Sequence, residues 1–367
     1  MEDLFVLPHT KENGYFEIRL ESIGGLGANL CGKMLGELGA LYLKLNASNF
    51  SSYGSEKRGS PVKSHIRWCA SNQFMRLCSP VVKPNVLGIF HEALLGNYSL
   101  ISDITNDTCV VLSTNLSPEE ASENYHISKG KLYCLPALEI AISEHSRVNM
   151  VMLGAITAVL GFVPIEIAEK LCTNTVGKKY PHLIEANLRG LRRGYEHIRK
   201  HSPYLCPSAP QTAQKGIKTS AYTWGYKNAP LGGINHLIGS TVSNDLSASR
   251  EGYIPLFIKE RCINCGLCDS TCPDYVFQFV SGNYKGKEMM VNNGPDYTHC
   301  KGCLRCVEIC PVDALVKVLE KDYPQKPYDQ PNKALLTTHF SMEKHGADAS
   351  ITGESHLTEQ QIDGGVL

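Results

Sequence analysis

Eight of the fifteen cysteines in this 367-residue chain fall into two near-copies of one motif. Both copies have the spacing C-x2-C-x2-C-x3-C-P, the first with Cys262, Cys265, Cys268 and Cys272, the second with Cys300, Cys303, Cys306 and Cys310. Thiolates at this spacing bind 4Fe–4S clusters, and the fourth cysteine of each run binds the other cluster of the pair. We therefore predict two crossed ligand sets: Cys262, Cys265, Cys268 and Cys310 for one cluster, and Cys300, Cys303, Cys306 and Cys272 for the other.

Zinc sites and disulfides are the alternatives for so many cysteines. Structural zinc sites use paired C-x-x-C units separated by a longer gap, whereas a third cysteine follows here at the same short spacing in both copies. Disulfides are typical of short secreted chains, and this N-terminus lacks a charged-then-apolar signal pattern. Gly266 and Gly302 are expected to supply backbone freedom where amides approach sulfur. The motifs predict single-electron carriers of generally low potential, with no acid, base or nucleophile among them.

The remaining cysteines are scattered, and most stand in apolar settings. We expect these seven to be buried thiols: Cys31, Cys69, Cys78, Cys109, Cys134, Cys172 and Cys206. The thirteen histidines show no HExxH motif or paired spacing, so we expect none of them to ligate a metal or act in catalysis.

Strand-like and helix-like segments alternate before the cysteine motifs. Strands are predicted over 16–22, 62–69, 85–90, 108–113 and 133–137, and helices over 29–45, 148–162, 166–172 and 181–201. In the first helix, Leu30, Met34, Leu38 and Leu41 have the spacing of one apolar face. The alternation predicts an α/β domain with a largely parallel sheet. The apolar run from Val148 to Val163 ends at Pro164 and is short of ~20 apolar residues, so it indicates a buried helix.

Composition divides the chain into four parts. We predict an α/β domain over 1–201, an extended connector rich in Pro, Gly, Ser and Asn over 202–250, a small α+β two-cluster ferredoxin-like domain over 251–322, and an extended or disordered tail over 323–367. The formal net charge is zero, which argues against a nucleic-acid partner. No membrane anchor and no signal pattern is recognised, so we expect a cytoplasmic protein.

A glycine cluster, Gly24-Gly25-Leu26-Gly27, stands between the first strand and the first helix. A dinucleotide site would need a further glycine where Leu30 stands, and an acidic residue near 45–47 for a ribose hydroxyl. Both are missing, so the glycines are expected only to allow a tight turn and close packing of helix on sheet.

A charged loop, Tyr53-Gly-Ser-Glu-Lys-Arg-Gly-Ser-Pro61, leads into the second predicted strand. Polar loops on a rigid scaffold often carry function. Lys57 and Arg58 could bind an anion such as phosphate or dock a partner carboxylate, and a solvated turn is the alternative. The sequence leaves the two interpretations open.

Taken together, these segments are similar to a known family. Glu17-Ile-Arg-Leu20, the glycine turn, the loop from Tyr53 to Lys63 and Asn149-Met-Val-Met-Leu-Gly154 resemble the gamma subunit of 2-oxoacid:ferredoxin oxidoreductases. Gly232-Gly233, the segment from Asn244 to Pro255 and the cysteine motifs resemble the delta subunit, so the chain looks like a gamma–delta fusion. The family turn usually reads GGQG, and Leu26 replaces the glutamine here. That replacement puts any polar contact from the turn in doubt.

The resemblance implies an enzyme subunit that carries electrons. Partner alpha and beta subunits would hold thiamine diphosphate, Mg and a further 4Fe–4S cluster, and would decarboxylate a 2-oxoacid, with coenzyme A usually taking the acyl group. This chain would pass the electrons through its two clusters to an external ferredoxin. Pyruvate is the first expectation for the substrate, and oxalate, 2-oxoglutarate, branched-chain or aryl 2-oxoacids stay open. The resemblance also suggests Arg58 as a contact to coenzyme A or to a partner subunit.

Two other hypotheses remain from the residues alone. A standalone ferredoxin-type electron carrier or adaptor with an α/β docking domain would carry the same cysteines. A pyridine-nucleotide-linked reductase would need the glycine fingerprint that is broken at Leu30. Some 200 residues of α/β domain are more than a simple carrier needs, which favours the enzyme subunit.

Overall fold

The computed structural model describes residues 7–8, 10–11, 13–53, 60–96, 98–178, 180–206 and 245–331. The chain divides into two compact units, Met1–Ile217 and Lys218–Leu367, and each is treated by itself. None of the helices in the described segments has the length and apolarity needed to span a membrane.

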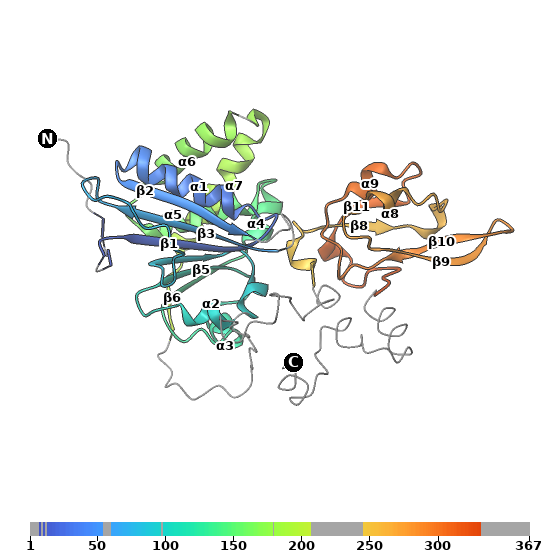
Figure 1. Ribbon diagram of the computed structural model, residues 1–367, viewed down its shortest axis with the longest axis horizontal. Coiled ribbons are helices and arrows are strands. Elements are labelled where there is room, and N and C mark those ends of the chain that lie inside the picture. The colour runs from blue at the N-terminus through green and yellow to red at the C-terminus, as the bar shows by residue number, and fades with distance from the viewer. Residues whose placement is uncertain are drawn as a thin grey trace, which may run out of the picture. The chain divides into compact units, whose positions relative to one another are not determined.

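In the described part of the first unit, seven strands form one sheet in the order β2-β3-β1-β4-β5-β6-β7 (Figure 1). The strands are β1 Phe16–Ile23, β2 Asn46–Tyr53, β3 Pro61–Cys69, β4 Val86–Ile89, β5 Cys109–Ser113, β6 Lys131–Leu135 and β7 Tyr204–Leu205. Strands β1, β4, β5 and β6 are parallel neighbours, while β2, β3 and β7 join antiparallel. The predicted α/β domain with a largely parallel sheet is confirmed, as a mixed sheet.

Two strands were not predicted from the sequence, and both lie at the edges of the sheet. Strand β2 is made of Asn, Ala, Ser, Phe and Tyr and is only partly buried, so it lacks the branched apolar residues that mark a strand. Strand β7 has two residues and pairs with β6, which extends the first unit beyond the predicted boundary at residue 201. An edge strand has only one strand neighbour, so its sequence is less constrained than that of a central strand.

Helices cover both faces of the sheet. They are α1 Ala28–Glu37, α2 Tyr98–Ser102, α3 Pro118–Asn124, α4 Ala137–Ser143, α5 Val148–Leu160, α6 Ile165–Cys172 and α7 Ile184–Lys200. Figure 1 shows α1, α6 and α7 above the sheet, and α2 and α3 below it. Below the sheet, α2 and α3 enclose a core that includes Leu87, Val110 and Leu132. Above it, nearly all of α5 is buried, as the long apolar run predicted.

Helix α1 corrects the predicted apolar face of the segment 29–45. Cys31, Met34, Leu35 and Leu38 are buried, whereas Leu30 and Leu41 are exposed. The α-helix ends at Glu37 and continues as a π-helical turn over Leu38–Tyr42. The extra residue in a π turn changes the angular phase of the side chains, so Leu41 leaves the face that an unbroken α-helix would give it.

Glycines bring α5 and α7 into backbone contact. A Cβ atom at Gly154 would overlap the carbonyl oxygen of Leu191, and one at Gly194 would overlap that of Val151. At its start, α5 also reaches the glycine turn, because the Asn149 Nδ2 donates to the Gly27 carbonyl oxygen at 3.4 Å. The resemblance segment Asn149–Gly154 therefore joins the turn to the helix pair.

The face of β1 and β3 opposite α1 carries buried charge. Three directly opposed pairs cross the two strands: Glu17 with Arg67, Arg19 with His65, and Glu21 with Lys63. The Arg67 Nε lies 2.7 Å from the Glu17 Oε1, and the Arg19 Nη1 lies 2.6 Å from the Asp103 Oδ2. We call these six opposed residues the charge ladder. The alternating pattern predicted for β1 therefore buries charged side chains as well as apolar ones.

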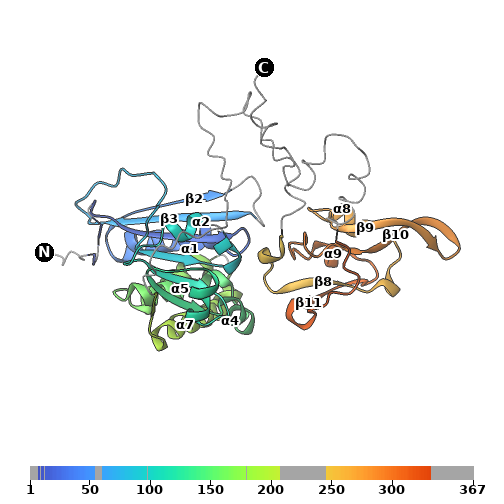
Figure 2. The same ribbon diagram turned by 90° about the horizontal axis from the view of Figure 1, so that it is seen from below.

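The second unit contains two small antiparallel pairs and two short helices. They are β8 Tyr253–Phe257 with β11 Leu315–Leu319, β9 Phe277–Tyr284 with β10 Lys287–Pro295, and the helices α8 Leu267–Thr271 and α9 Arg305–Ile309. In both views, β9 and β10 extend as a hairpin from the body formed by β8, β11, α8 and α9 (Figure 2). This is the small α+β domain that the cysteine motifs predicted.

The domain ends differ from their predicted positions. Residues 323–331, predicted as the start of a tail, pack on the second unit: the Tyr328 ring lies 5.8 Å from that of Phe257, and the Gln330 N–H donates to the Pro295 carbonyl oxygen. Residues 332–367 and most of the predicted connector, 207–244, lie outside the described residues. The same holds for Arg58 and Lys57, within 54–59.

Candidate metal centre

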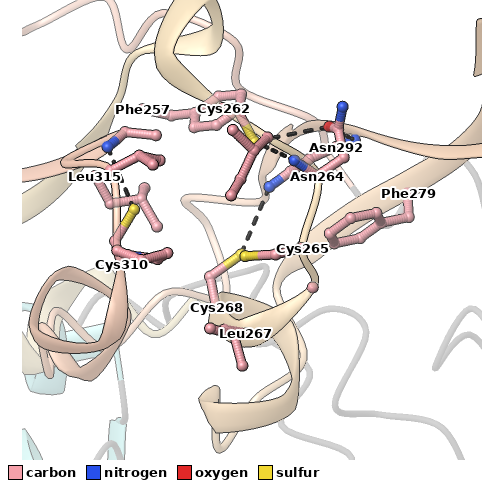
Figure 3. Close-up of a pocket in the computed structure, with 15 residues that line it drawn as sticks. Phe257, Cys262, Asn264, Cys265, Leu267, Cys268, Phe279, Asn292, Cys310 and Leu315 are labelled. Carbon is pink, nitrogen blue, oxygen red and sulfur yellow. Dashed lines mark hydrogen bonds between the residues drawn. The ribbon is translucent and has the colours of Figure 1, made fainter. Parts of the chain in front are cut away.

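Two pockets in the second unit gather the motif cysteines. Cys262, Cys265, Cys268 and Cys310 line one pocket together with Phe257, Phe279 and Leu315 (Figure 3). Cys272, Cys300, Cys303 and Cys306 line a second pocket with Val276 and Phe277. Each pocket takes three cysteines from one motif copy and the fourth from the other. We call the first group the outer set and the second group the inner set.

The two loops that wrap these pockets have the same backbone form. Positive φ angles recur at matched positions, at Asn264 and Gly302 two residues after the first cysteine, and at Gly266 and Leu304 just before the helix. A third pair, Tyr275 and Asp313, follows the fourth cysteine of each copy. The expected glycine freedom therefore holds at Gly266 and Gly302, but asparagine and leucine adopt the same conformation in the other copy. The sequence repeat is a repeat of backbone shape.

Backbone amides point at the sulfur atoms in both sets. The Asn264 N–H donates to the Cys262 Sγ at 3.4 Å, and the Gly302 N–H donates to the Cys300 Sγ at 3.5 Å. The Ala314 N–H donates to the Cys310 Sγ at 3.2 Å. Positive φ turns the amide toward the sulfur that precedes it by two residues, which explains why the loops need this conformation. Such donors stabilise negative charge on sulfur.

Burial makes these thiols poor acids when they are free. It raises the pKa of Cys268 to about 12 and that of Cys300 to about 11, even though the Arg250 charge opposes the shift at Cys300. It also raises the pKa of Cys306, with the neighbouring cysteines adding to the shift. A bound metal deprotonates a coordinating thiol outright. Four cysteines, a mostly apolar lining and N–H donors aimed at sulfur suit a 4Fe–4S cubane, so both pockets fit that group.

The outer and inner sets differ in exposure and in their polar neighbours. Cys265 of the outer set is exposed, whereas Cys300 and Cys306 of the inner set are buried. Arg250 is buried beside the inner set; its Nε donates to the Cys300 carbonyl oxygen at 2.9 Å, and it also binds Glu320 and the Tyr297 carbonyl. Beside the outer set, the polar neighbour is Asn292, whose Nδ2 donates to the Cys268 Sγ at 3.6 Å.

The cysteines line pockets and do not converge on a point. All fifteen cysteines are free, so no two of them form the disulfide considered as an alternative. In the segments that the structure describes, no three His, Cys, Asp or Glu side chains gather as they would around one metal ion. Outside the two sets, the expectation of buried thiols is right for Cys31, Cys69, Cys172 and Cys206 and wrong for Cys78, which is exposed on the segment between β3 and β4.

The glycine turn lies beside a third hollow. Ser22, Gly25, Ala28 and Asn29 line it, together with Tyr53 at the end of β2. Gly25 and Gly27 have φ angles of 118° and 82°, so the predicted tight turn between strand and helix is confirmed. Arg58 belongs to the segment that follows Tyr53 and lies outside the described residues, so its role stays a prediction.

Sequence reasoning missed two residues that touch the cysteine pockets. Arg250 stands in a segment quoted for its resemblance, but nothing in its neighbours along the chain indicated burial against Cys300. Asn292 stands 24 residues after Cys268, on the hairpin between the two motif copies. A hairpin between duplicated motifs is the available signal, because an insertion at that place has to pack against one of the two ligand sets.

Comparison with known families gives two matches. The family described as pyruvate ferredoxin/flavodoxin oxidoreductase matches residues 17–197, and the 4Fe-4S dicluster domain family matches residues 257–318. Pyruvate synthase subunit PorC of Thermotoga maritima is 34% identical over 188 residues, which cover 50% of this chain and 95% of PorC. The 2-oxoglutarate synthase subunit KorC of Methanocaldococcus jannaschii is 31% identical, over 49% of this chain and 92% of KorC.

A longer relative and a crystal structure add to these matches. Pyruvate-flavodoxin oxidoreductase of Trichormus variabilis aligns with 92% of this chain at 22% identity, and the alignment takes up 32% of that longer protein. The crystal structure of pyruvate oxidoreductase subunit PORC from T. maritima is 31% identical, covers 50% of this chain and 96% of its own, and superposes with a TM-score of 0.43. In the sequence alignment, about half of this chain spans 95% of PorC.

Proposed function

Because the chain belongs to the gamma-subunit family of 2-oxoacid:ferredoxin oxidoreductases and also carries a 4Fe–4S dicluster domain, we propose that it is the fused gamma–delta, electron-transfer subunit of such an enzyme. The observation that supports the electron-transfer role most directly is the pair of four-cysteine pockets in the second unit. The match to gamma-type relatives over the α/β domain favours an enzyme subunit over a standalone carrier.

The outer and inner sets are proposed as the ligand sets of the two clusters. Each cluster, when bound, accepts and releases one electron at a time. The chain supplies thiolates for the iron atoms, amides of Asn264, Gly302 and Ala314 that stabilise the sulfur charge, and apolar walls that keep water from the clusters. Cys265 gives the outer set an exposed edge, which we propose as the side that a redox partner approaches.

The carbon chemistry is assigned to partner subunits. Beside its cysteines, the inner pocket is lined by Asp274 and Lys301, which form an ion pair at 2.8 Å, and the α/β domain lacks a dinucleotide fingerprint. We propose alpha and beta partners that carry thiamine diphosphate, Mg and a further 4Fe–4S cluster, and an external ferredoxin as the acceptor. Pyruvate is the first substrate to test, since PorC is a pyruvate synthase subunit, and 2-oxoglutarate is the second, since KorC is a 2-oxoglutarate synthase subunit.

The test is an activity measurement on the assembled enzyme. The chain is co-expressed with alpha and beta partners, purified without oxygen and assayed for viologen reduction that depends on pyruvate, 2-oxoglutarate, oxalate, or a branched-chain or aryl 2-oxoacid. Reduction with one of these acids, with or without coenzyme A, is the expected result. Failure with every acid, from a preparation loaded with both clusters, would contradict the proposal.

Two exposed cysteines provide a matched control for this assay. Cys265 belongs to the outer set, whereas Cys78 lies on the α/β domain outside both sets, and both are exposed. Cys265→Ala is expected to abolish 2-oxoacid-dependent electron transfer through this chain, while Cys78→Ala leaves it intact. Equal activity of the two variants would argue against the outer set as a cluster site.

A further inference from the structure

Asn292 is a buried asparagine that touches the outer set from outside both cysteine motifs. Only 1% of its surface is exposed, and its Nδ2 donates to the Cys268 Sγ at 3.6 Å (Figure 3). Most hydrogen bonds to cluster cysteines come from the backbone and are therefore independent of residue type. A side-chain donor can be changed by substitution, so its presence here is a feature of this particular sequence.

A β-bulge aims Asn292 at the pocket. The register of β10 against β9 shifts between Asn292 and Gly294, so Asn293 is the extra residue of the bulge. Gly294 has a φ angle of 129°, and a Cβ atom there would overlap the Tyr328 carbonyl oxygen. Bulges bend a strand and redirect the side chain beside them. Here the bend places one amide of the hairpin against the cysteine pocket.

One hydrogen bond orients the side-chain amide of Asn292, and two hydrogen bonds from backbone N–H groups tie this part of the hairpin to the cysteine loop. The Asn292 Oδ1 accepts from the Gly294 N–H at 3.0 Å, which leaves the Nδ2 to face the sulfur. The Asn292 N–H donates to the Asn264 Oδ1 at 2.9 Å, and the Asn264 N–H in turn donates to the Cys262 Sγ. The two asparagines thus link the bulge to two cysteines of the same set.

From this geometry we infer that Asn292 raises the reduction potential of the cluster held by the outer set. Reduction adds one electron to the cluster and increases the negative charge on its cysteine sulfurs, so an N–H donor to sulfur stabilises the reduced form more than the oxidised form. The inference rests on the proposed function, because it takes the outer set as cluster ligands. The inner set has a different source of stabilisation, the buried Arg250 charge beside Cys300.

The test compares two substitutions at Asn292 with a neighbouring control. Asn292→Leu removes the donor at similar volume, and Asn292→Asp removes it while keeping the oxygen that accepts from Gly294. Asn293→Ala is the control, because the Asn293 side chain points to Lys259, with its Oδ1 3.4 Å from the Nζ. The full-length chain is purified without oxygen, and both midpoint potentials are followed by electron paramagnetic resonance during a redox titration.

We expect one of the two potentials to fall in Asn292→Leu, so that the ratio of reduced to oxidised cluster at a fixed potential drops about tenfold, or about 59 mV for one electron. The fall is larger in Asn292→Asp because a negative charge is added. The second potential and the Asn293→Ala control stay at their wild-type values. Two loaded clusters with unchanged potentials, or an equal shift of both, would overturn the role of Asn292.

A direct measurement covers the case in which neither variant assembles its clusters. In the wild-type chain, asparagine labelled with 15N at the side-chain amide should give a hyperfine coupling to the reduced cluster. Its absence from a fully loaded protein overturns the inference. Wild-type protein that binds less iron than two clusters need contradicts the proposed function itself, and so the two failures are distinguished.

Discussion

The two units bury polar groups in opposite ways. In the α/β domain, the charge ladder pairs its buried charges within the chain, as in the 2.7 Å contact of the Arg67 Nε with the Glu17 Oε1. In the second unit, burial raises the pKa values of the half-buried Cys268 thiol and the buried Cys306 thiol, and neighbouring cysteines add to both shifts. The first unit therefore offsets its buried charge largely with ion pairs of its own, whereas we expect the second to need metal to stabilise its buried sulfurs.

Removal of iron is expected to produce the largest difference in stability between the two units. The core of the second unit is small, and its buried members include Cys300 and Cys306 beside Ile254, Phe257 and Tyr297. We expect anaerobic chelation to abolish amide protection over 251–331 and to leave that of 16–206 unchanged, as measured by hydrogen exchange on the full chain. Persistent protection over 251–331 in the iron-free chain would show that the second unit does not need iron to stay folded.

Crossed ligation predicts which cluster a single cysteine serves. Cys310→Ala should damage the cluster of Cys262, Cys265 and Cys268 and spare the one whose cysteines are nearer in sequence. Cys272→Ala is the mirror variant and should damage the inner set instead. Iron content and the electron paramagnetic resonance of the remaining cluster decide the result. If Cys310→Ala changes the cluster of Cys300, Cys303 and Cys306, the crossed assignment is wrong.

The charge ladder should make the α/β domain sensitive to loss of one charge. Arg67→Met leaves the buried Glu17 with only the more exposed Lys11 as an ion-pair partner and the Ser79 carbonyl without its donor, at a cost of about 3 kcal/mol. Arg192→Met is the control, since Arg192 forms a similar contact with Glu169 at an exposed site worth less than about 1 kcal/mol. Denaturation followed by Trp68 fluorescence, in a Trp224→Phe background, measures both. Equal costs would show that burial does not distinguish the pairs.

His65 should make the stability of the α/β domain depend on pH. Burial, with the Arg19 and Lys63 charges adding to it, lowers the pKa of His65 to about 4, and its Nδ1 accepts from the Val81 N–H. The unfolded chain, with a histidine pKa near 6.5, binds more protons between pH 6.5 and 4, so stability falls as pH falls through that range.

Between pH 7.5 and 5 the wild type should therefore lose about 2 kcal/mol more stability than His65→Gln. Burial raises the pKa of the neighbouring Glu21, but that contribution is common to both proteins. His182→Gln, at an exposed position, should behave as the wild type. Parallel stability curves for wild type and His65→Gln would show that His65 does not titrate in this way.

The smallest expected difference in stability is between two glycine variants of the second unit. Gly302→Ala places a Cβ atom 2.8 Å from the Tyr253 carbonyl oxygen, whereas Gly266→Ala meets nothing within 4 Å, although both glycines have positive φ. Gly302→Ala should therefore destabilise the loaded module by about 1 kcal/mol more than Gly266→Ala, or roughly 5 °C in the temperature at which visible iron–sulfur absorbance is lost. A reversed order would contradict the tighter surroundings of the inner set.

Local patterns carried most of the predicted fold. The cysteine spacing, the glycine turn and the apolar run of α5 depend on neighbours along the chain, and the sequence therefore contains them. Strand β2, the π turn after Glu37 and the packing of Tyr328 on Phe257 depend on distant partners, and no local pattern marks them. The same division holds at the candidate site. The cysteines were predicted from their spacing, whereas Asn292 and Arg250 come close to the pockets only when the chain is folded.

The glycine contacts between α5 and α7 have a consequence for how the α/β domain opens. Where Gly154 meets the Leu191 backbone and Gly194 meets that of Val151, no side-chain layer separates the helices. Neither helix can tilt or slide without breaking contact along the whole seam, so the pair opens as one cooperative unit. Asn149 extends that unit to the turn at Gly27. We therefore expect the rim of the hollow beside β2 to open together with the α5–α7 pair.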